Sequence, residues 1–314
     1  MSSAAKAKIS LVSPFFNEEK GVQAFFGRIH EVFAPLRDRY DLEVIAVNDG
    51  SRDQTYAELV KAKARLGYVT VIDLSRNFGK EAAISAGLDF ASGDAVIPID
   101  SDLQHPPEVV LELIEKWEEG AEVVLAKRID RETDRPIQKI TANWFYKLHN
   151  RISDIDIPAD VGDFRLMDRK VVEAIRTLPE TRRFMKGLFA WVGFRTAVVE
   201  YRVARREHGR SSFNTWKLWN FALEGITSFS SAPLRIWTYV GCIVSAMSFI
   251  YAAYLLVDRL YFGTDTPGYA SIMITILFAS GVQLIGIGVL GEYVGRIFAE
   301  SKKRPVYIVR DVLK

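Results

Sequence analysis

Residues 95–107 read AVIPIDSDLQHPP, an apolar run that ends in two carboxylates one residue apart. Asp100 and Asp102 follow the run directly, and Gln104 comes two residues after the second acid. A short apolar run bounded by turn residues is typical of a buried strand, and unpaired charges are costly to bury. Helix N-capping explains one acid at such a position, but not two together. We therefore interpret the pair as part of a binding site at a strand end.

The residues around this stretch alternate between strand and helix patterns. Strands are expected at 8–14, 41–51, 69–75, 95–100 and 121–128, and helices at 15–36, 53–66, 80–91 and 106–120. This alternation predicts an α/β fold with a doubly wound, mostly parallel sheet. Ligands of such sheets bind at the carboxyl ends of the strands. Asp49 ends the second expected strand, Asp100 and Asp102 end the fourth, and Glu18 follows the first.

Composition excludes several classes of protein. The chain has 314 residues and a formal net charge of +2, so charge alone indicates neither a nucleic-acid binder nor an acidic tail. The single cysteine, Cys242, excludes an intramolecular disulfide and a multi-cysteine zinc site. The first residues lack the long apolar core of a signal peptide. We therefore expect the N-terminal part to stay in the cytosol.

Two runs without any charge, 236–257 and 269–291, are long enough to cross a bilayer as helices. Two buried helices of a soluble protein are the alternative, but such helices rarely run so long without a charge. Basic residues flank the pair on its outer sides, which predicts that both ends are cytoplasmic. These are Arg235, Arg296, Lys302, Lys303 and Arg304.

The chain is accordingly expected to have four parts. Residues 1–212 form the catalytic domain, 213–234 an amphipathic juxtamembrane helix with tryptophans at headgroup depth, 235–299 a transmembrane hairpin and 300–314 a cytoplasmic tail. The tail reads as a strand that pairs either with a sheet edge of its own chain or with a neighbouring subunit. Glycines such as Gly291 and Gly295 in the second run allow close helix contact, within the hairpin or in a homo-oligomer.

The paired acids suit two different ligands. One carboxylate can meet a ribose or base, and the other can hold a hard divalent cation, with Gln104 as a further oxygen donor. Magnesium commonly takes one or two protein carboxylates and fills its shell with water and substrate phosphates. No GxxxxGK[ST] motif occurs, which disfavours a P-loop NTPase. A diphosphate leaving group held through a metal ion fits better.

Four motifs give this pattern a specific resemblance. SPFFNEE (13–19), VNDGS (47–51), SRNFGKEAA (75–83) and DSDLQHPP (100–107) occur in the order and spacing of family 2 glycosyltransferases of the GT-A fold. DSDLQHPP resembles the dolichyl-phosphate mannose synthase branch. The two apolar runs and GITSFSSAPLR (225–235) resemble the bacterial polyprenyl-phosphate glycosyltransferases, which include the bactoprenol glucosyltransferases of O-antigen modification.

The resemblance implies a role for each residue of these motifs. Nucleotide-sugar binding falls to Pro14, Phe15, Glu18, Asp49, Arg76, Gly79, Lys80 and Asp100. Asp102 and Gln104 would hold Mg²⁺ or Mn²⁺. The acceptor phosphate would be bound by Arg128, Arg131, Arg206, Ser211 and Ser212. The catalytic set comprises Asp102, Asp160, Asp163 and Arg165. Relatives usually carry lysine where this chain has Ser212, so one phosphate contact differs.

A polyprenyl phosphate acceptor sets modest chemical demands. Its second pKa lies near 6, so the attacking oxygen is already largely ionised and needs positioning and nearby cations rather than a strong base. Arginines suit this task because guanidinium binds phosphate in a bidentate fork. Asp163 then either orients Arg165 or other acceptor-site arginines through an ion pair, which we favour, or acts as a base.

The resemblance implies an inverting transferase that moves one sugar from UDP-glucose to a polyprenyl phosphate at the cytoplasmic face of the bacterial inner membrane. GDP-mannose is the alternative donor. A processive polysaccharide synthase is disfavoured because no Q-x-x-R-W motif occurs. A transporter or flippase subunit is disfavoured because the two runs contain no ionisable residue along a polar pathway. The bilayer and the lipid acceptor are the expected partners, and nucleic acid is not.

Overall fold

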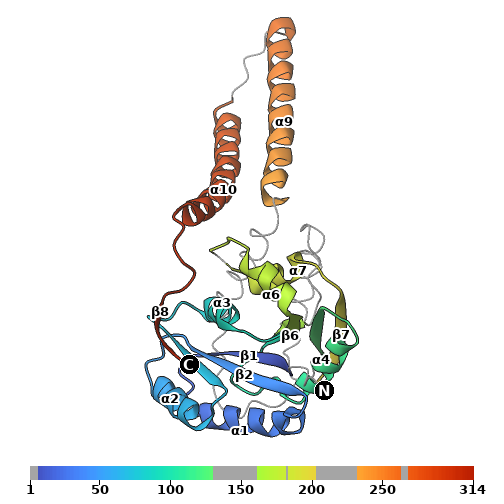
Figure 1. The fold of residues 1–314 in the computed structure, drawn as a ribbon. Helices are drawn as coiled ribbons and strands as arrows, with labels where there is room; N and C mark the ends of the chain where they lie inside the picture. Colours follow the sequence, from blue (N-terminus) through green and yellow to red (C-terminus); the bar gives the residue numbers. More distant parts are fainter. Residues whose placement is uncertain (1–5, 130–160, 182, 203–231, 263–267) are drawn as a thin grey trace.

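The structure is a computed structural model, described here for residues 6–129, 161–181, 183–202, 232–262 and 268–314. An α/β domain is followed by two long helices, and the chain then returns to the domain for its last strand (Figure 1).

Within the described residues the sheet has eight strands in the order β7-β5-β6-β4-β1-β2-β3-β8. The central strands β4, β1, β2 and β3 run parallel, whereas β6 is antiparallel to β4 and β5, and β8 is antiparallel to β3. The predicted α/β fold with a mostly parallel sheet is confirmed. The strands are β1 (Ala7–Phe15), β2 (Tyr40–Asn48), β3 (Val69–Leu74), β4 (Ala95–Pro98), β5 (Val123–Arg128), β6 (Val161–Asp168), β7 (Thr196–Tyr201) and β8 (Val309–Leu313).

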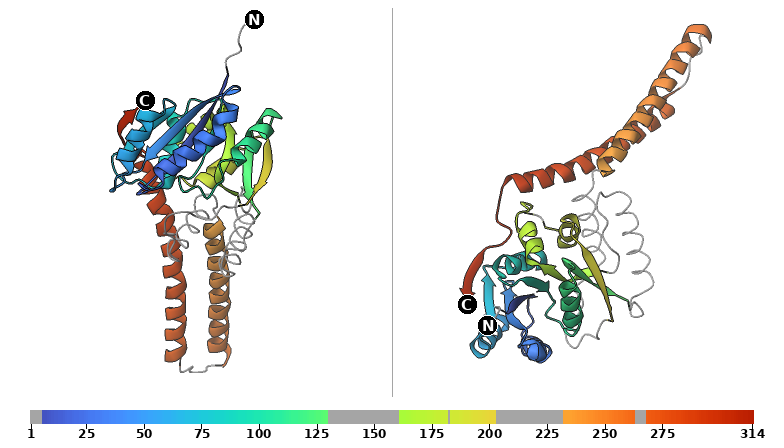
Figure 2. Two further views of the ribbon diagram at one scale, coloured as in Figure 1. Left: turned by 90° about the horizontal axis from the view of Figure 1, so that it is seen from below. Right: turned by 45° about the vertical axis from the view of Figure 1, so that its right-hand side comes forward.

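Helices cover both faces of the sheet (Figures 1 and 2). One face carries α1 (Val22–Phe33), η1 (Ala34–Leu36), α2 (Thr55–Arg65) and α4 (Val109–Glu118), and the other carries α3 (Lys80–Phe90), α6 (Arg169–Arg176) and α7 (Met185–Trp191). The second face is the one nearer the two long helices (Figure 1).

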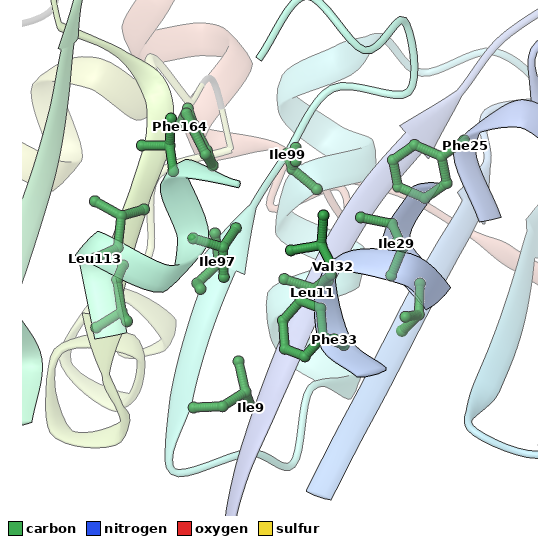
Figure 3. Packing of buried hydrophobic residues seen from close by; sticks show 14 of the residues in the cluster. Ile9, Leu11, Phe25, Ile29, Val32, Phe33, Ile97, Ile99, Leu113 and Phe164 are labelled. Carbon is green, nitrogen blue, oxygen red and sulfur yellow. The ribbon is translucent and has the colours of Figure 1, made fainter. Parts of the chain in front are cut away.

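Each face of the sheet buries its own apolar cluster, because strand residues alternate in direction. Figure 3 shows the first cluster, in which Ile9 and Leu11 of β1 pack against Ile29 and Phe33 of α1. Val12 points the opposite way, into the cluster under α3. Burying one such side chain stabilises the fold by about 1.5–3 kcal/mol. The two clusters therefore fix which way each strand residue points.

The two long helices are α9 (Ala232–Phe262) and α10 (Tyr269–Ser301). They contain segments long and apolar enough to cross a membrane, Ile236–Leu255 and Ser271–Ser301, and 0% of either segment is buried inside the protein. Large apolar side chains such as Phe249 and Leu284 are exposed along them. These helices are therefore not the core of a soluble domain, and they mark the chain as membrane-associated.

The contact between Gly87 of α3 and Val12 of β1 gives a test of the packing. A Cβ added at Gly87 would overlap Val12 Cγ1 on β1. We expect Gly87→Ala to lower the free energy of unfolding by about 1–3 kcal/mol, the usual cost of overpacking a core. Thermal unfolding of the detergent-solubilised chain measures the loss.

Gly27→Ala is the matched control, because an added Cβ in α1 meets nothing within 4 Å. Alanine is the better helix former, so this variant should be as stable as the wild type or up to about 1 kcal/mol more stable. Equal stabilities of the two variants would contradict the described packing of α3 on β1.

Candidate active site

Three segments meet at the carboxyl ends of the central strands. Asp100 follows β4, Lys80 begins α3, and Asp163 lies near the start of β6, which runs antiparallel to β4. Lys80 Nζ lies 2.7 Å from Asp100 Oδ1 and 2.9 Å from Asp163 Oδ2. One lysine thus bridges two carboxylates that come from different strands.

The bridge shifts the pKa of all three groups. Partial burial lowers the pKa of Lys80, but the charges of Asp163 and Asp100 outweigh it and raise that pKa above its ordinary value. Burial likewise raises the pKa of Asp100, yet Lys80 and then His105 bring it well below its usual range. The pKa of Asp163 is also lowered, chiefly by Lys80 acting against burial. Both carboxylates are therefore ionised at neutral pH.

His105 extends this network toward the far edge of the sheet. Its Nε2 lies 3.3 Å from Asp100 Oδ2, and its Nδ1 lies 2.8 Å from the hydroxyl of Tyr201 at the end of β7. The imidazole packs on the ring of Phe164, with centroids 5.1 Å apart. Burial raises the pKa of Tyr201 to about 12, so its hydroxyl stays neutral. Asp100 is thus held from one side by Lys80 and from the other by His105.

Arg165 lies two residues beyond Asp163 on β6, but its contacts differ from those we expected. Its Nη2 donates to the carbonyl of Gly162 at 2.7 Å, and its guanidinium lies 4.3 Å from the ring centre of Phe189. Burial lowers the pKa of Arg165 to about 10, against the opposing effect of Asp163. Asp163 forms an ion pair with Lys80, and no ion pair between Asp163 and Arg165 occurs among the described residues. The other alternative, that Asp163 orients further acceptor-site arginines, stays a prediction.

Two atoms of this pair remain without a hydrogen-bond partner in the part of the chain that the structure describes. They are Asp163 Oδ1 and Arg165 Nε, and both are buried. Unsatisfied buried polar atoms are uncommon in folded proteins and call for an explanation. They place an unused acceptor and an unused donor beside the lysine bridge.

Asp49 organises the loop that precedes α3. Its Oδ1 accepts the amide of Phe78 at 2.7 Å, and its Oδ2 accepts the amide of Gly79 at 3.0 Å and the side-chain amide of Asn77 at 2.9 Å. Burial raises the pKa of Asp49, and the two backbone amides oppose this shift. The Asp49 side chain is therefore committed to the loop, whereas the resemblance implied direct contact with the nucleotide.

Gly50 brings the loop and the end of β2 into direct contact. It has a φ of +63°, which favours glycine, and a Cβ there would overlap the backbone of Arg76 and Asn77. Arg76 lies over the ring of Phe78, 4.1 Å from its centre. The VNDGS and SRNFG motifs therefore form one packed unit at the strand ends.

Phe15 does not contribute its side chain to the site. It is 0% exposed and packs edge-on against Phe25 at 5.4 Å in the cluster under α1. A nucleotide contact by the Phe15 side chain is therefore wrong, because that side chain points to the opposite face of the sheet from α3. Pro14 lies next to it and is half-buried. Glu18 follows the strand, and its amide donates to Thr55 Oγ1 at 2.8 Å.

The expected metal ligands lie in the loop after β4. Asp102 Oδ1 accepts the amide of Gln104 at 3.1 Å. No cluster of three or more His, Cys, Asp or Glu side chains that could hold a metal occurs among the residues described here. The oxygen donors present suit Mg²⁺ or Mn²⁺, which need few protein ligands when substrate phosphates complete the shell.

Of the predicted acceptor-phosphate residues, Arg128 is described. It ends β5, and its charge lowers the pKa of Tyr201 against the effect of burial. Other predicted residues lie outside the described part of the chain, together with most of the predicted amphipathic helix 213–234: Arg131, Asp160, Arg206, Ser211 and Ser212.

Two residues of the network were not predicted from the sequence. Tyr201 contacts His105 from an edge strand, and no motif marks it. Glu81 follows Lys80 and accepts the amide of Met185 at 3.1 Å, and burial followed by the charge of Asp163 raises its pKa. A glutamate directly after the lysine in SRNFGKE was the signal available for the second residue.

Comparison with known proteins assigns these motifs to a family. The pattern of glycosyl transferase family 2 matches residues 10–176, and that of the GtrB C-terminal hairpin matches residues 232–297. The first match spans the strand ends described above, and the second spans most of α9 and α10.

Among similar proteins, the bactoprenol glucosyl transferase of Shigella phage SfV is 56% identical over 97% of this chain and 98% of its own. The prophage bactoprenol glucosyl transferase homolog of Escherichia coli K12 is 53% identical over 98% of this chain and 100% of its own. A solved structure, glucosyl-3-phosphoglycerate synthase from Mycobacterium tuberculosis with Mn²⁺, UDP-glucose and phosphoglyceric acid, is 22% identical with a TM-score of 0.47, covering 71% of this chain and 78% of that one. That distant likeness adds no argument, but the two near relatives and the family pattern show that this chain is a glycosyltransferase and belongs to glycosyl transferase family 2.

Proposed function

We propose that this chain transfers glucose from UDP-glucose to a polyprenyl phosphate at the cytoplasmic face of the membrane. The observation that carries the proposal is the 56% identity to a bactoprenol glucosyl transferase over 97% of the chain, a span that includes both the strand-end motifs and the hairpin. The strand-end network supports it, because Lys80, Asp100 and His105 lie in motifs that resemble those of family 2 glycosyltransferases.

The donor would lie on the surface formed by the ends of β1, β2 and β4 and by the loop 76–79. Asp49 holds that loop through two backbone amides, so the shape of the surface is set before the donor arrives. Lys80 keeps Asp100 ionised and fixed, and an ionised carboxylate is the acceptor that sugar or ribose hydroxyls need.

A divalent cation fits this surface. Asp102 and Gln104 would hold it, and the cation would neutralise charge on the diphosphate leaving group. The chain's own cation, Lys80, lies beside Asp100, two residues from Asp102, and adds positive charge on the same side.

The acceptor would approach from the side of α9 and α10. These helices lie beyond the face of the sheet that carries α3, α6 and α7 (Figure 1). On the same face, Lys80 at the start of α3 pairs with Asp163, and Arg165 lies over Phe189 of α7. We infer that both termini lie in the cytoplasm, which the basic residues outside the two spans support. Arg128, Arg131 and Arg206, which the resemblance assigns to the acceptor phosphate, would hold the already ionised lipid phosphate for attack on the anomeric carbon.

Labelled sugar transfer tests the proposed reaction. Membranes from cells overproducing the protein receive labelled UDP-glucose or labelled GDP-mannose in parallel, with polyprenyl phosphate and with or without EDTA. We expect organic-extractable label from UDP-glucose only, and its loss in EDTA. Label from GDP-mannose alone would replace the donor assignment, and extractable label that EDTA does not affect would reject the metal.

Asp102→Asn tests the metal-holding carboxylate. Removing one charged oxygen ligand should lower transfer at least about 100-fold, on the scale of losing one transition-state electrostatic contact, and should leave thermal unfolding unchanged. Asp41→Asn is the control, because Asp41 is exposed at the opposite end of β2. An Asp102→Asn enzyme with wild-type rates would remove Asp102 from the reaction.

Lys80→Met tests the bridge between the two carboxylates. The variant leaves the charges of Asp100 and Asp163 without their shared cation. Because the Lys80 side chain is 43% exposed, we expect a loss of about 1–2 kcal/mol, below the about 3–5 kcal/mol of a fully buried pair. Adding Asp163→Asn should restore part of that stability in thermal unfolding, without restoring transfer.

Lys127→Met provides the comparison, because both side chains of the Lys127–Glu200 pair are exposed. Its loss should lower the free energy of unfolding by no more than about 0.5 kcal/mol. A double variant less stable than Lys80→Met alone would contradict the bridge.

A further inference from the structure

The C-terminal tail returns from the second long helix to the sheet domain. After α10 ends at Ser301, the chain crosses to the outer edge of the sheet, where β8 pairs antiparallel with β3 (Figures 1 and 2). The register places Val71 opposite Leu313 and Leu74 opposite Val309. The edge strand covered in this way is the one that runs directly into the loop 75–79.

Arg310 makes the charged contacts between the tail and that strand. Its Nη1 lies 3.2 Å from Asp73 Oδ2, and its Nη2 donates to the carbonyl of Ser75 at 2.7 Å. The amide of Ser75 in turn donates to the carbonyl of Ile308 at 2.9 Å. The tail therefore holds both backbone groups of the residue at which the loop begins.

A second route leads from Arg310 to the same loop through the sheet. The Asp73 side chain is 3% exposed, and its other oxygen accepts Asn48 Nδ2 at 2.7 Å. Asn48 precedes Asp49, whose carboxylate holds the amides of Phe78 and Gly79. Arg310 thus supports the loop in two ways. It contacts Ser75, the first residue of the loop, and through Asp73 it supports Asn48, the residue before Asp49.

We propose that Arg310 is a positioning residue for the loop 75–79 and for Lys80, which follows it. Through Arg310, the tail that follows the second long helix sets the shape of the proposed nucleotide-sugar site. The identity of the donor in this role rests on the proposed function, whereas the contacts of Arg310 do not depend on it. Without Arg310, Asp73 keeps a buried charge with no cation beside it, which destabilises the local arrangement. The carbonyl of Ser75 also loses a charge-assisted donor, a stronger contact than a neutral one.

The test compares three full-length variants with the wild type in detergent. Arg310→Met removes the charge, Arg310→Lys retains it, and Asp311→Asn changes the next residue of the same strand. Asp311 contacts the hydroxyl of Tyr56 on α2 at 3.4 Å and lies opposite Asp73 in the strand register, so Asp311→Asn removes a neighbouring charge while Arg310 and its two contacts stay in place. Initial rates give KM for the donor, KM for the acceptor and kcat. Hydrogen exchange followed by mass spectrometry reports the amides of residues 75–79.

For Arg310→Met we expect donor KM to rise about tenfold, because misplacing a binding group by ~1 Å can cost up to about 100-fold. Acceptor KM should stay within about twofold. Exchange should quicken at the amides of Phe78 and Gly79 and stay unchanged in α1. Arg310→Lys should recover most of the donor affinity, and Asp311→Asn should match the wild type.

Unchanged donor KM or unchanged exchange at residues 75–79 in Arg310→Met overturns the proposal, as does an equal rise in both KM values. If Arg310→Met does not fold, Arg310→Lys decides, with an expected donor KM about threefold above wild type and an unchanged value contradicting the role. A wild type that transfers no glucose would reject the proposed function, and the exchange measurement would still test Arg310 because it needs no substrate.

Discussion

The arrangement of the site depends on one electrostatic constraint, the placement of Lys80 between Asp100 and Asp163. Two ionised carboxylates repel each other, and burial raises the cost of keeping both charged. The antiparallel pairing of β4 with β6 brings their segments together at one end of the sheet, and the lysine at the start of α3 makes that approach favourable. Removing Lys80 would leave two carboxylates without their shared cation, and removing either carboxylate would take one of its two partners from Lys80.

Packing around α3 and the loop before it positions Lys80. Gly87 lets α3 lie close on β1, and Gly50 lets the turn after β2 meet the backbone of the loop before α3. Asp49 then fixes the loop by its amides, and β8 closes the edge of the sheet behind it. Residues 302–308 lead from α10 to β8, so a short segment joins the membrane-associated part to the sheet domain (Figure 2). Within this segment the hydroxyl of Tyr307 donates to Asp89 Oδ2 at 2.7 Å.

Much of this was predictable from the sequence. The alternation of apolar strands and amphipathic helices predicted the sheet, and the acids at strand ends predicted the edge at which Lys80, Asp100 and Asp163 meet. The partner of each charged group was not predictable, because Lys80 and Asp163 are far apart in the chain and meet only through the pairing of β4 with β6. Phe15 was assigned to the nucleotide although the period of two in β1 places it with Ile9 and Leu11. The sequence also predicted a strand in the tail, but an edge of the same sheet and an edge of a neighbouring subunit satisfy its hydrogen bonds equally well.

The central claim is that the strand ends around Lys80 bind a uridine nucleotide sugar together with a divalent cation. Isothermal titration of the purified chain with UDP-glucose, in Mg²⁺ and in EDTA, tests it most directly. We predict saturable binding in Mg²⁺ that weakens strongly in EDTA and in Lys80→Met. Binding of equal strength in all three conditions, or stronger binding of GDP-mannose, would contradict it.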